Sequence, residues 1–337
     1  MSRESIANGF VVAIMLGMSV VGGAAERPRI GELELSIRRA SEAGKFSQVQ
    51  ALHKEAAEYC AEALDYACAV KHYELLLAGR PGRRERVGYF LQLGKMREAL
   101  QDYSGAIAAY QDALHDQPRD YQATIALARA YDKIDLSGRA VEYYRKGAAL
   151  APQDAKPLLL LADVYMRIGY LSKAIESYQN ALRLSPSADA YLGMVDCFVR
   201  QDDLAGAART LDEGKALLSI AEYDARRGDI NQRLGDGPGA AEAWELALSH
   251  DARRDDVRLK LVLLYDRLHR RAEADRHLQV LLAQFPRSPL VHFVRAWILY
   301  GRGDRQGSRR EALAVQSLAP TEGVQHYNER LLALINK

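Results

Sequence analysis

Residues 161–186 read LADVYMRIGYLSKAIESYQNALRLSP, and the order of residue types in this stretch decides the fold. Its small residues, aromatic residues and closing proline are, in order, Ala162, Tyr165, Gly169, Ala174, Tyr178, Ala181 and Pro186. Apolar residues at helical spacing predict one helix over about 155–168 and a second over about 171–184. A turn at Gly169 joins them, because glycine adopts left-handed backbone angles without steric cost.

The small and aromatic residues have different roles in packing such a helix pair. Ala162 and Ala174 are small because two closely crossing helices leave no room for a large side chain. Tyr165 and Tyr178 belong to the apolar stripe that each helix buries against its neighbours. Pro186 lacks a backbone N–H, so it ends one helix at the point where the next pair begins.

The same pattern recurs along the chain with a period of 34 residues. Prolines separated by this period are Pro118, Pro152 and Pro186, and also Pro286 and Pro320. The aromatic residues move with the prolines, so that Tyr110 and Tyr144 occupy the repeat position of Tyr178. A period of this length indicates a chain built from repeated structural units.

This pattern resembles the tetratricopeptide repeat family, whose unit is a helix-turn-helix of 34 residues. The resemblance covers most of the chain and implies an all-α, right-handed superhelical solenoid of about eight units. One unit cannot bury its own apolar face, so stability comes from stacking. The family's large aromatic residue near the start of the first helix is Phe90 in one unit, but Thr124, Leu158, Arg258 and His292 in others. These departures predict weaker local packing.

The repeat phase predicts the organisation of the chain. We expect N-terminal helices and a degenerate unit over residues 31–86, repeat units over 87–322, and a capping helix over 323–337. The expected repeat units are 87–120, 121–154, 155–188, 188–220, 221–254, 255–288 and 289–322.

Three aromatic residues, Phe293, Trp297 and Tyr300, follow helical spacing in the last unit. We expect them to pack against the adjacent unit or the capping helix. If exposed, they would instead form an apolar end to a partner-binding groove.

The N-terminal 25 residues differ in composition from the rest of the chain. Residues 10–21, FVVAIMLGMSVV, form an uncharged and mostly apolar run followed by small residues. Such a run is typical of a secretory signal peptide, and we place its cleavage after Ala25, which makes residues 1–25 the signal segment. The alternative is an uncleaved membrane anchor over residues 6–25, because a membrane span needs about 20 apolar residues. The favoured interpretation predicts an exported chain, periplasmic or secreted.

Composition and motifs favour a binding protein over an enzyme. The chain has 337 residues, and its 46 basic and 44 acidic residues give a formal net charge of +2, which argues against nucleic-acid binding. Residues 88–95, GYFLQLGK, lack the spacing of a phosphate-binding loop. No GxSxG or HExxH motif occurs, and the eight histidines are dispersed. We therefore expect no catalytic residue, no metal site and no cofactor.

Two cysteines give a more specific hypothesis. Cys60 lies near the end of an expected first helix and Cys68 near the start of the following second helix. An antiparallel hairpin brings such positions close, and an oxidising compartment would permit a disulfide between them. The alternative is that both are separately buried small residues. Cys197 has no evident mate and is expected in the core.

Charged residues recur near the ends of the expected first helices. The candidate binding residues are Arg129, Lys133, Asp163, Arg167, Asp196, Arg200, Asp229, Arg233 and Arg267. One interpretation is a basic ladder along a concave groove, where the family commonly docks partner peptides. The other is structural, because cations favour helix C-termini and Asp–Arg pairs at i,i+4 stabilise a helix.

The resemblance implies a non-enzymatic scaffold that binds a protein or peptide partner in the concave groove of an exported chain. Exported proteins of this kind often serve envelope assembly, polysaccharide export or pilus biogenesis. An anionic peptide or glycan would suit the basic ladder. The alternatives are a glycan-binding or polymer-guiding groove, and an accessory subunit for a polysaccharide-handling enzyme. Membrane contact is expected only through an uncleaved N-terminal segment.

Overall fold

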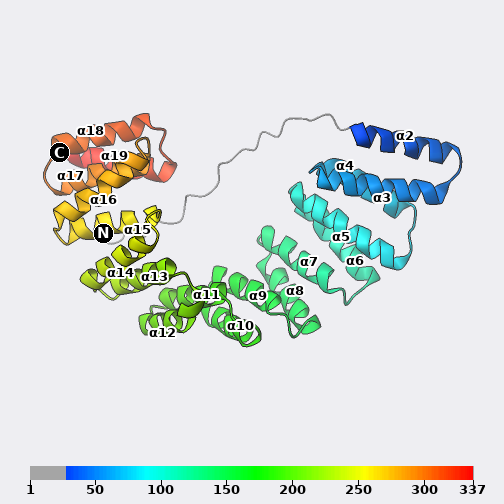
Figure 1. Ribbon diagram of the computed structural model, residues 1–337, viewed down its shortest axis with the longest axis horizontal. Helices are drawn as coiled ribbons and strands as arrows, with labels where there is room; N and C mark the ends of the chain where they lie inside the picture. The colour runs from blue at the N-terminus through cyan, green and yellow to red at the C-terminus, as the bar shows by residue number, and fades with distance from the viewer. Residues whose placement is uncertain (1–27, 337) are drawn as a thin grey trace. The chain divides into compact units, whose positions relative to one another are not determined.

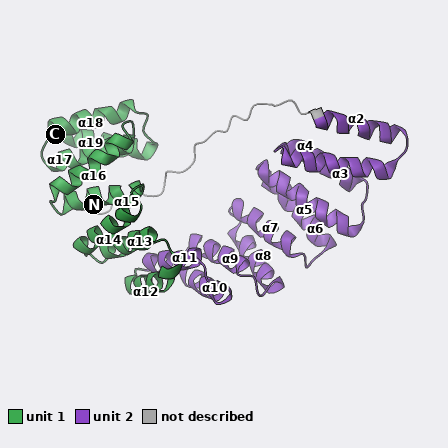
Figure 2. Ribbon diagram, in the orientation of Figure 1, with its two compact units in different colours: residues 1–14, 202–337 green, residues 15–201 purple. Residues whose placement is uncertain are grey.

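The computed structural model describes residues 28–336, which form eighteen α-helices joined by short turns, with no β-strand in that range (Figure 1). The predicted all-α fold is therefore confirmed. The predicted signal segment, residues 1–25, lies outside the described residues. The described residues divide into two compact units, an N-terminal unit of residues 28–201 and a C-terminal unit of residues 202–336, which Figure 2 colours purple and green.

The N-terminal unit consists of ten helices. They are α2 (Pro28–Glu42), α3 (Phe46–Glu62), α4 (Tyr66–Ala78), α5 (Arg83–Ala99), α6 (Tyr103–Asp116), α7 (Tyr121–Lys133), α8 (Ser137–Leu150), α9 (Lys156–Arg167), α10 (Leu171–Leu184) and α11 (Ala188–Arg200). Helices α3 and α4, α5 and α6, α7 and α8, and α9 and α10 pack as hairpins, and each hairpin also contacts the next one along the chain. We call the members of each pair the first and second helix.

The C-terminal unit continues this arrangement. Its helices are α12 (Leu204–Gly214), the 3₁₀ turn η1 (Lys215–Leu217), α13 (Ile220–Arg233), α14 (Gly237–His250), α15 (Asp255–Arg267), α16 (Arg271–Gln284), α17 (Pro289–Gly301), α18 (Arg305–Ser317) and α19 (Glu322–Ile335). The hairpins are α13 with α14, α15 with α16, and α17 with α18.

The turn inside each hairpin is set by one residue with left-handed backbone angles. Gly169, predicted for this role, has φ +84°, and Gly235 has φ +80° at the corresponding place. Elsewhere a residue other than glycine takes the position, as with Gln101 at φ +62°. An aspartate follows this residue in several hairpins and caps the second helix, as when the Asp102 carboxylate accepts from the Gly105 N–H.

The predicted small residues lie at the closest helix contacts. Ala162 on α9 and Ala174 on α10 are fully buried, and Tyr178 is 2% exposed beside them in the same apolar cluster. Gly94 on α5 is the corresponding small residue of an earlier hairpin, and a Cβ there would overlap the buried ring of Tyr110 on α6. Close helix crossing therefore explains the small residues of the repeat, as predicted.

The last helix closes the C-terminal unit. Helix α19 buries Val324, Leu331 and other apolar residues in a cluster that includes Phe293 and Ala296 of α17. Trp297 and Tyr300 pack against the same cluster. The prediction that these aromatic residues belong to the core beside the capping helix is confirmed.

Candidate functional site

Consecutive first helices of the N-terminal unit are joined by polar contacts between repeats. Arg129 on α7 lies 3.6 Å from the carboxylate of Glu98 on α5. Arg167 on α9 binds the carboxylate of Asp132 on α7, and its other guanidinium nitrogen lies 3.5 Å from Asp135. Each of these arginines therefore pairs with a carboxylate contributed by the repeat before it.

Arg200 on α11 reaches the preceding repeat in a different way. Its guanidinium donates a hydrogen bond of 2.5 Å to the backbone carbonyl of Met166, in the last turn of α9. The last carbonyls of a helix have no partner within it and carry partial negative charge. Arg200 therefore satisfies the end of the neighbouring first helix.

The C-terminal unit repeats this arrangement with other residues. Lys260 on α15 lies 2.6 Å from the carboxylate of Asp229 on α13. Arg302, which follows α17, lies 2.9 Å from Asp266 on α15 and 2.7 Å from Asp275 on α16. We call the polar residues of the first helices, taken in each unit separately, the first-helix face.

Two predicted pairs within single helices are wrong. Asp163 does not pair with Arg167, because its carboxylate accepts from the hydroxyl of Tyr178 while Arg167 turns to Asp132. Burial raises the pKa of Asp163, and the hydrogen bond from Tyr178 opposes that shift. Asp229 likewise accepts from the indole N–H of Trp244 and pairs with Lys260, so it does not pair with Arg233.

Three of the predicted cations stay exposed. Lys133, Arg233 and Arg267 are the last residues of α7, α13 and α15, and none forms an ion pair within residues 28–336. Their positions match the structural interpretation, since a cation is favourable at a helix C-terminus. Their charge is nevertheless available to a partner. Asp196, the remaining candidate, is half-buried on α11.

The C-terminal unit has a hollow of about 450 Å³ that the sequence pattern does not predict. It is lined by Asp212, Glu213, Lys215, Ala216, Ile220 and Tyr223. The Tyr223 hydroxyl donates to Asp212 at 2.6 Å, and the Lys215 ammonium lies 4.6 Å from the Tyr223 ring centre. The signal in the sequence is the short unit 188–220, which lacks the closing proline where α12 gives way to η1.

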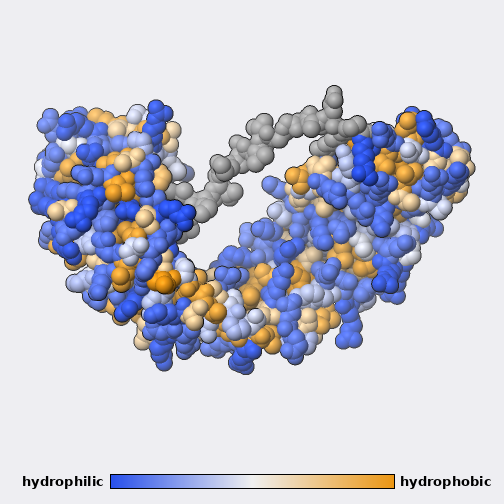
Figure 3. Space-filling view, in the orientation of Figure 1, coloured by the Kyte–Doolittle hydropathy of each residue, from blue (hydrophilic) through white to orange (hydrophobic). Residues whose placement is uncertain are grey.

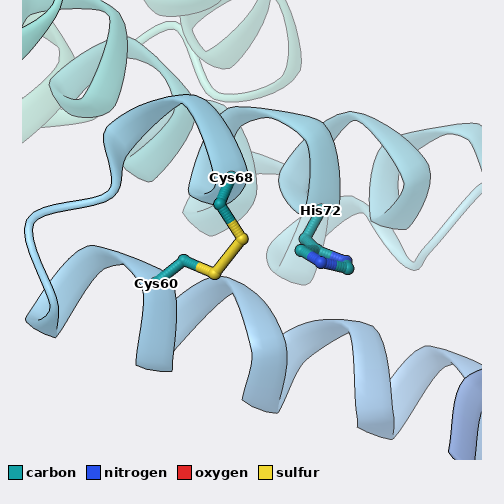
Figure 4. A group of neighbouring side chains, drawn as sticks. All are labelled: Cys60, Cys68 and His72. Carbon is teal, nitrogen blue, oxygen red and sulfur yellow. A yellow bond between two sulfur atoms is a disulfide. The ribbon is translucent and has the colours of Figure 1, made fainter. Parts of the chain in front are cut away.

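The three cysteines are separated into a pair and a single residue. Cys60 on α3 and Cys68 on α4 form a disulfide, with Cα atoms 5.7 Å apart (Figure 4). Cys197 is a free and fully buried thiol on α11, and burial raises its pKa to about 11. Its thiolate is therefore scarce at neutral pH.

The surface of each unit is mainly polar. On the side shown in Figure 3, hydrophilic residues cover most of each unit, and apolar residues form small separate groups. Within residues 28–336, no helix combines the length and hydrophobicity that crossing a membrane requires.

Comparison with known sequences identifies the repeat. A family profile described as a tetratricopeptide repeat matches residues 91–155 and 159–219. Comparison with curated protein sequences gives no match.

Solved structures share the helical architecture. The type IV pilus biogenesis factor PilW is 19% identical, with a TM-score of 0.50 over 59% of this chain and 94% of PilW. The Cut9–Hcn1 structure is 14% identical, with a TM-score of 0.50 over 86% of this chain and 59% of the matched chain. PilF of Pseudomonas aeruginosa is 18% identical, with a TM-score of 0.48 over 61% of this chain and 95% of PilF. At these identities the likeness to PilW and to the Cut9–Hcn1 structure concerns the fold alone.

Proposed function

We propose that this chain, whose residues 91–155 and 159–219 match the tetratricopeptide repeat profile, is a non-enzymatic scaffold that binds an anionic protein segment on its first-helix face. The observation that carries this proposal is the division of the face into paired and unpaired charges. Arg167, Lys260 and Arg302 are paired with carboxylates, whereas Lys133, Arg233 and Arg267 are exposed and unpaired within the described residues. The paired residues hold neighbouring repeats together, and the unpaired ones are free to attract a partner.

The compartment proposed for this scaffold is extracytoplasmic. Two features support it: the apolar segment within residues 1–25 and the disulfide between Cys60 and Cys68. A role in envelope assembly, polysaccharide export or pilus biogenesis fits this location, and PilW is described as a pilus biogenesis factor. The pathway itself is part of the proposal.

The decisive variant reverses the three unpaired charges together, as Lys133→Glu, Arg233→Glu and Arg267→Glu. Crosslinking in intact cells, followed by affinity purification and mass spectrometry, would identify partners of the full chain. We expect the triple variant to lose its main protein partner while keeping its helicity, because none of the three residues is paired within the described residues.

A matched control reverses three exposed arginines on α10, α12 and α18: Arg183→Glu, Arg209→Glu and Arg309→Glu. This control changes the net charge by the same amount and should keep the partner. Equal loss of the partner in both variants would show that binding depends on net charge alone, which would contradict the proposal. Arg167 is left unchanged, because a glutamate there would face Asp132 and disturb repeat stacking.

One observation favours the glycan alternative. Tyr170, in the turn after Arg167, is 57% exposed and offers an aromatic surface on which a sugar ring could stack. Recovery of polysaccharide without any protein partner, abolished by Tyr170→Ala, would support a glycan-binding face and overturn the protein scaffold.

A further inference from the structure

Four side chains with metal-binding chemistry meet inside the first hairpin of the N-terminal unit. His53 and Cys60 come from α3, and Cys68 and His72 come from α4. His53, Cys60 and His72 are 9%, 2% and 1% exposed, and Cys68 is half-buried. Figure 4 shows Cys60 and Cys68 joined across the two helices, with His72 extending from α4 on the same side as Cys68.

The ligand atoms of these residues are close together. One ligand atom each from Cys60, Cys68 and His72 lie within 4.8 Å of one another. The Nδ1 atoms of His53 and His72 are 2.9 Å apart, so His53 contacts the His72 ring without belonging to this group of three. The Nε2 atom of His72 is buried and has no hydrogen-bond partner within the described residues.

These separations are near those of a tetrahedral zinc site. Zinc binds imidazole nitrogen at about 2.0–2.1 Å and thiolate sulfur at about 2.3 Å, which places neighbouring ligand atoms about 3.3–3.8 Å apart. The ligand atoms of Cys60, Cys68 and His72 lie within 4.8 Å of one another, so modest shifts would bring them into this range. The sulfur atoms, which are bonded to each other, must separate to admit an ion.

The hairpin supplies this geometry without relying on the sulfur–sulfur bond. Cys68 and His72 are four residues apart on α4, so they share one face of that helix. The surrounding cluster includes Ala57 on α3 and Tyr73 and Leu76 on α4, all buried. This apolar packing would hold the two helices in register when the disulfide is opened.

We propose that Cys60, Cys68 and His72 bind a zinc-class divalent ion when the disulfide is reduced, with a water completing the tetrahedron, so that the hairpin has two alternative closed states. A dithiol reductant would break the Sγ–Sγ bond, yielding two protein thiols while the reductant becomes its own disulfide. Binding of Zn²⁺ by both thiols then releases two protons, and the His72 imidazole binds through a nitrogen lone pair. Two sulfurs and one imidazole nitrogen form a ligand set typical of zinc rather than of calcium or magnesium.

The test uses the full chain, reduced with a dithiol and then freed of reductant without oxygen. Titration with Co²⁺ reports the geometry, because tetrahedral thiolate coordination gives intense visible absorption and a sulfur-to-metal charge-transfer band. We expect one ion per chain, displaced by Zn²⁺, with no binding by the oxidised chain. A reduced, folded chain that takes up no Co²⁺ would overturn the proposal.

Variants separate the site from adventitious binding. We expect Cys60→Ser with Cys68→Ser to abolish the charge-transfer band, and His72→Asn to abolish tetrahedral coordination. The control His269→Asn alters an exposed histidine with left-handed backbone angles that asparagine tolerates, and it should bind as the unchanged chain does. Binding that survives His72→Asn with an unchanged spectrum would contradict the three-residue site.

A second measurement needs no substitution. Zinc should protect Cys60 and Cys68 in the reduced chain from alkylation and slow the return of the disulfide, both readable by mass spectrometry. Equal alkylation rates with and without zinc would contradict the proposal. Because this measurement uses the unchanged chain, it remains decisive if a variant fails to fold.

Discussion

At the scale of single residues, the two glycines of α5 lie in opposite environments. A Cβ on Gly94 would overlap the ring of the buried Tyr110, whereas a Cβ on Gly88 would meet no atom within 4 Å. We expect Gly94→Ala to destabilise the chain by about 1–3 kcal/mol through overpacking. Gly88→Ala should stabilise it by about 0.5–1 kcal/mol, because alanine is the better helix former. Urea denaturation followed by circular dichroism measures both, and equal effects would contradict the packing argument.

The turn residue of each hairpin gives a second contrast between single residues. Gln101 adopts φ +62°, a conformation that costs a residue with a Cβ about 1 kcal/mol. Gln101→Gly should therefore raise the melting temperature, and Gly169→Ala, at φ +84°, should lower it. Thermal melts of both variants measure whether the melting temperature rises or falls. A fall in melting temperature for Gln101→Gly would show that unfolded-state entropy outweighs the turn strain.

At the scale of helices, one carboxylate of the C-terminal unit joins three of them. Glu245 on α14 accepts from Tyr265 on α15 at 2.8 Å and lies 3.0 Å from Nε2 of His277 on α16. The hydrogen bond from His277 lowers the pKa of Glu245, with further help from Tyr265 and Arg276 and opposition from burial. Because its pKa is depressed on folding, this group stabilises the fold above the unfolded pKa, and the contribution is lost as pH falls through the folded pKa.

Glu245→Gln should therefore weaken the chain near neutral pH and flatten the loss of stability below about pH 4.3, the ordinary glutamate value. Solvent screening of a half-exposed carboxylate limits the neutral-pH effect to about 1 kcal/mol or less. Denaturation at a series of pH values provides the test, with Glu242→Gln, an exposed neighbour on α14, as the control. If the free energy of unfolding falls as steeply with decreasing pH in Glu245→Gln as in the unchanged chain, the Glu245 carboxylate is not the source of that fall.

Helix positions and the buried faces were predictable because they follow a period. Ala162, Ala174 and Tyr178 are buried as expected, since each stands where a helix must meet its neighbour. The partner of Arg167 was not predictable. Asp163 lies four residues away on the same helix, but the side chain turns to Asp132 on the preceding repeat. The position of Asp132 relative to Arg167 depends on how two hairpins stack, which spacing within one helix does not encode.

The hairpin of Cys60 and Cys68 shows the same limit. Its spacing indicates that the cysteines approach each other, but the meeting of His53 and His72 beside them depends on the rotation of α3 against α4. No periodic signal marks that contact, so the spacing of the histidines in the sequence does not indicate it. The repeat boundaries, from 87–120 to 289–322, stay a prediction.

At the scale of the whole molecule, a change in the stability of one repeat should affect only the repeats next to it. Opening the disulfide removes a constraint confined to the hairpin of α3 and α4. We expect reduction to lower hydrogen-exchange protection in α3, α4 and the adjoining helices α2 and α5, and to leave α15–α18 unchanged. Exchange measured by mass spectrometry with and without reductant tests this. Loss of protection spread evenly over the chain would show long-range cooperativity.

The contacts between first helices also restrict how such a chain can evolve. Arg167 belongs to one hairpin and its carboxylate, Asp132, to the hairpin before, while the carbonyl of Met166 serves Arg200 of the hairpin after. Deleting the hairpin of α9 and α10 would leave Asp132 without Arg167, whereas Arg200 uses a backbone carbonyl that any repeat contains. Duplicating it would set Arg167 of the second copy opposite a neighbour that has no Asp132. The order of these repeats is thus recorded in side-chain pairs such as Arg167 with Asp132, and gain or loss of a module would require a compensating substitution wherever such a pair is broken.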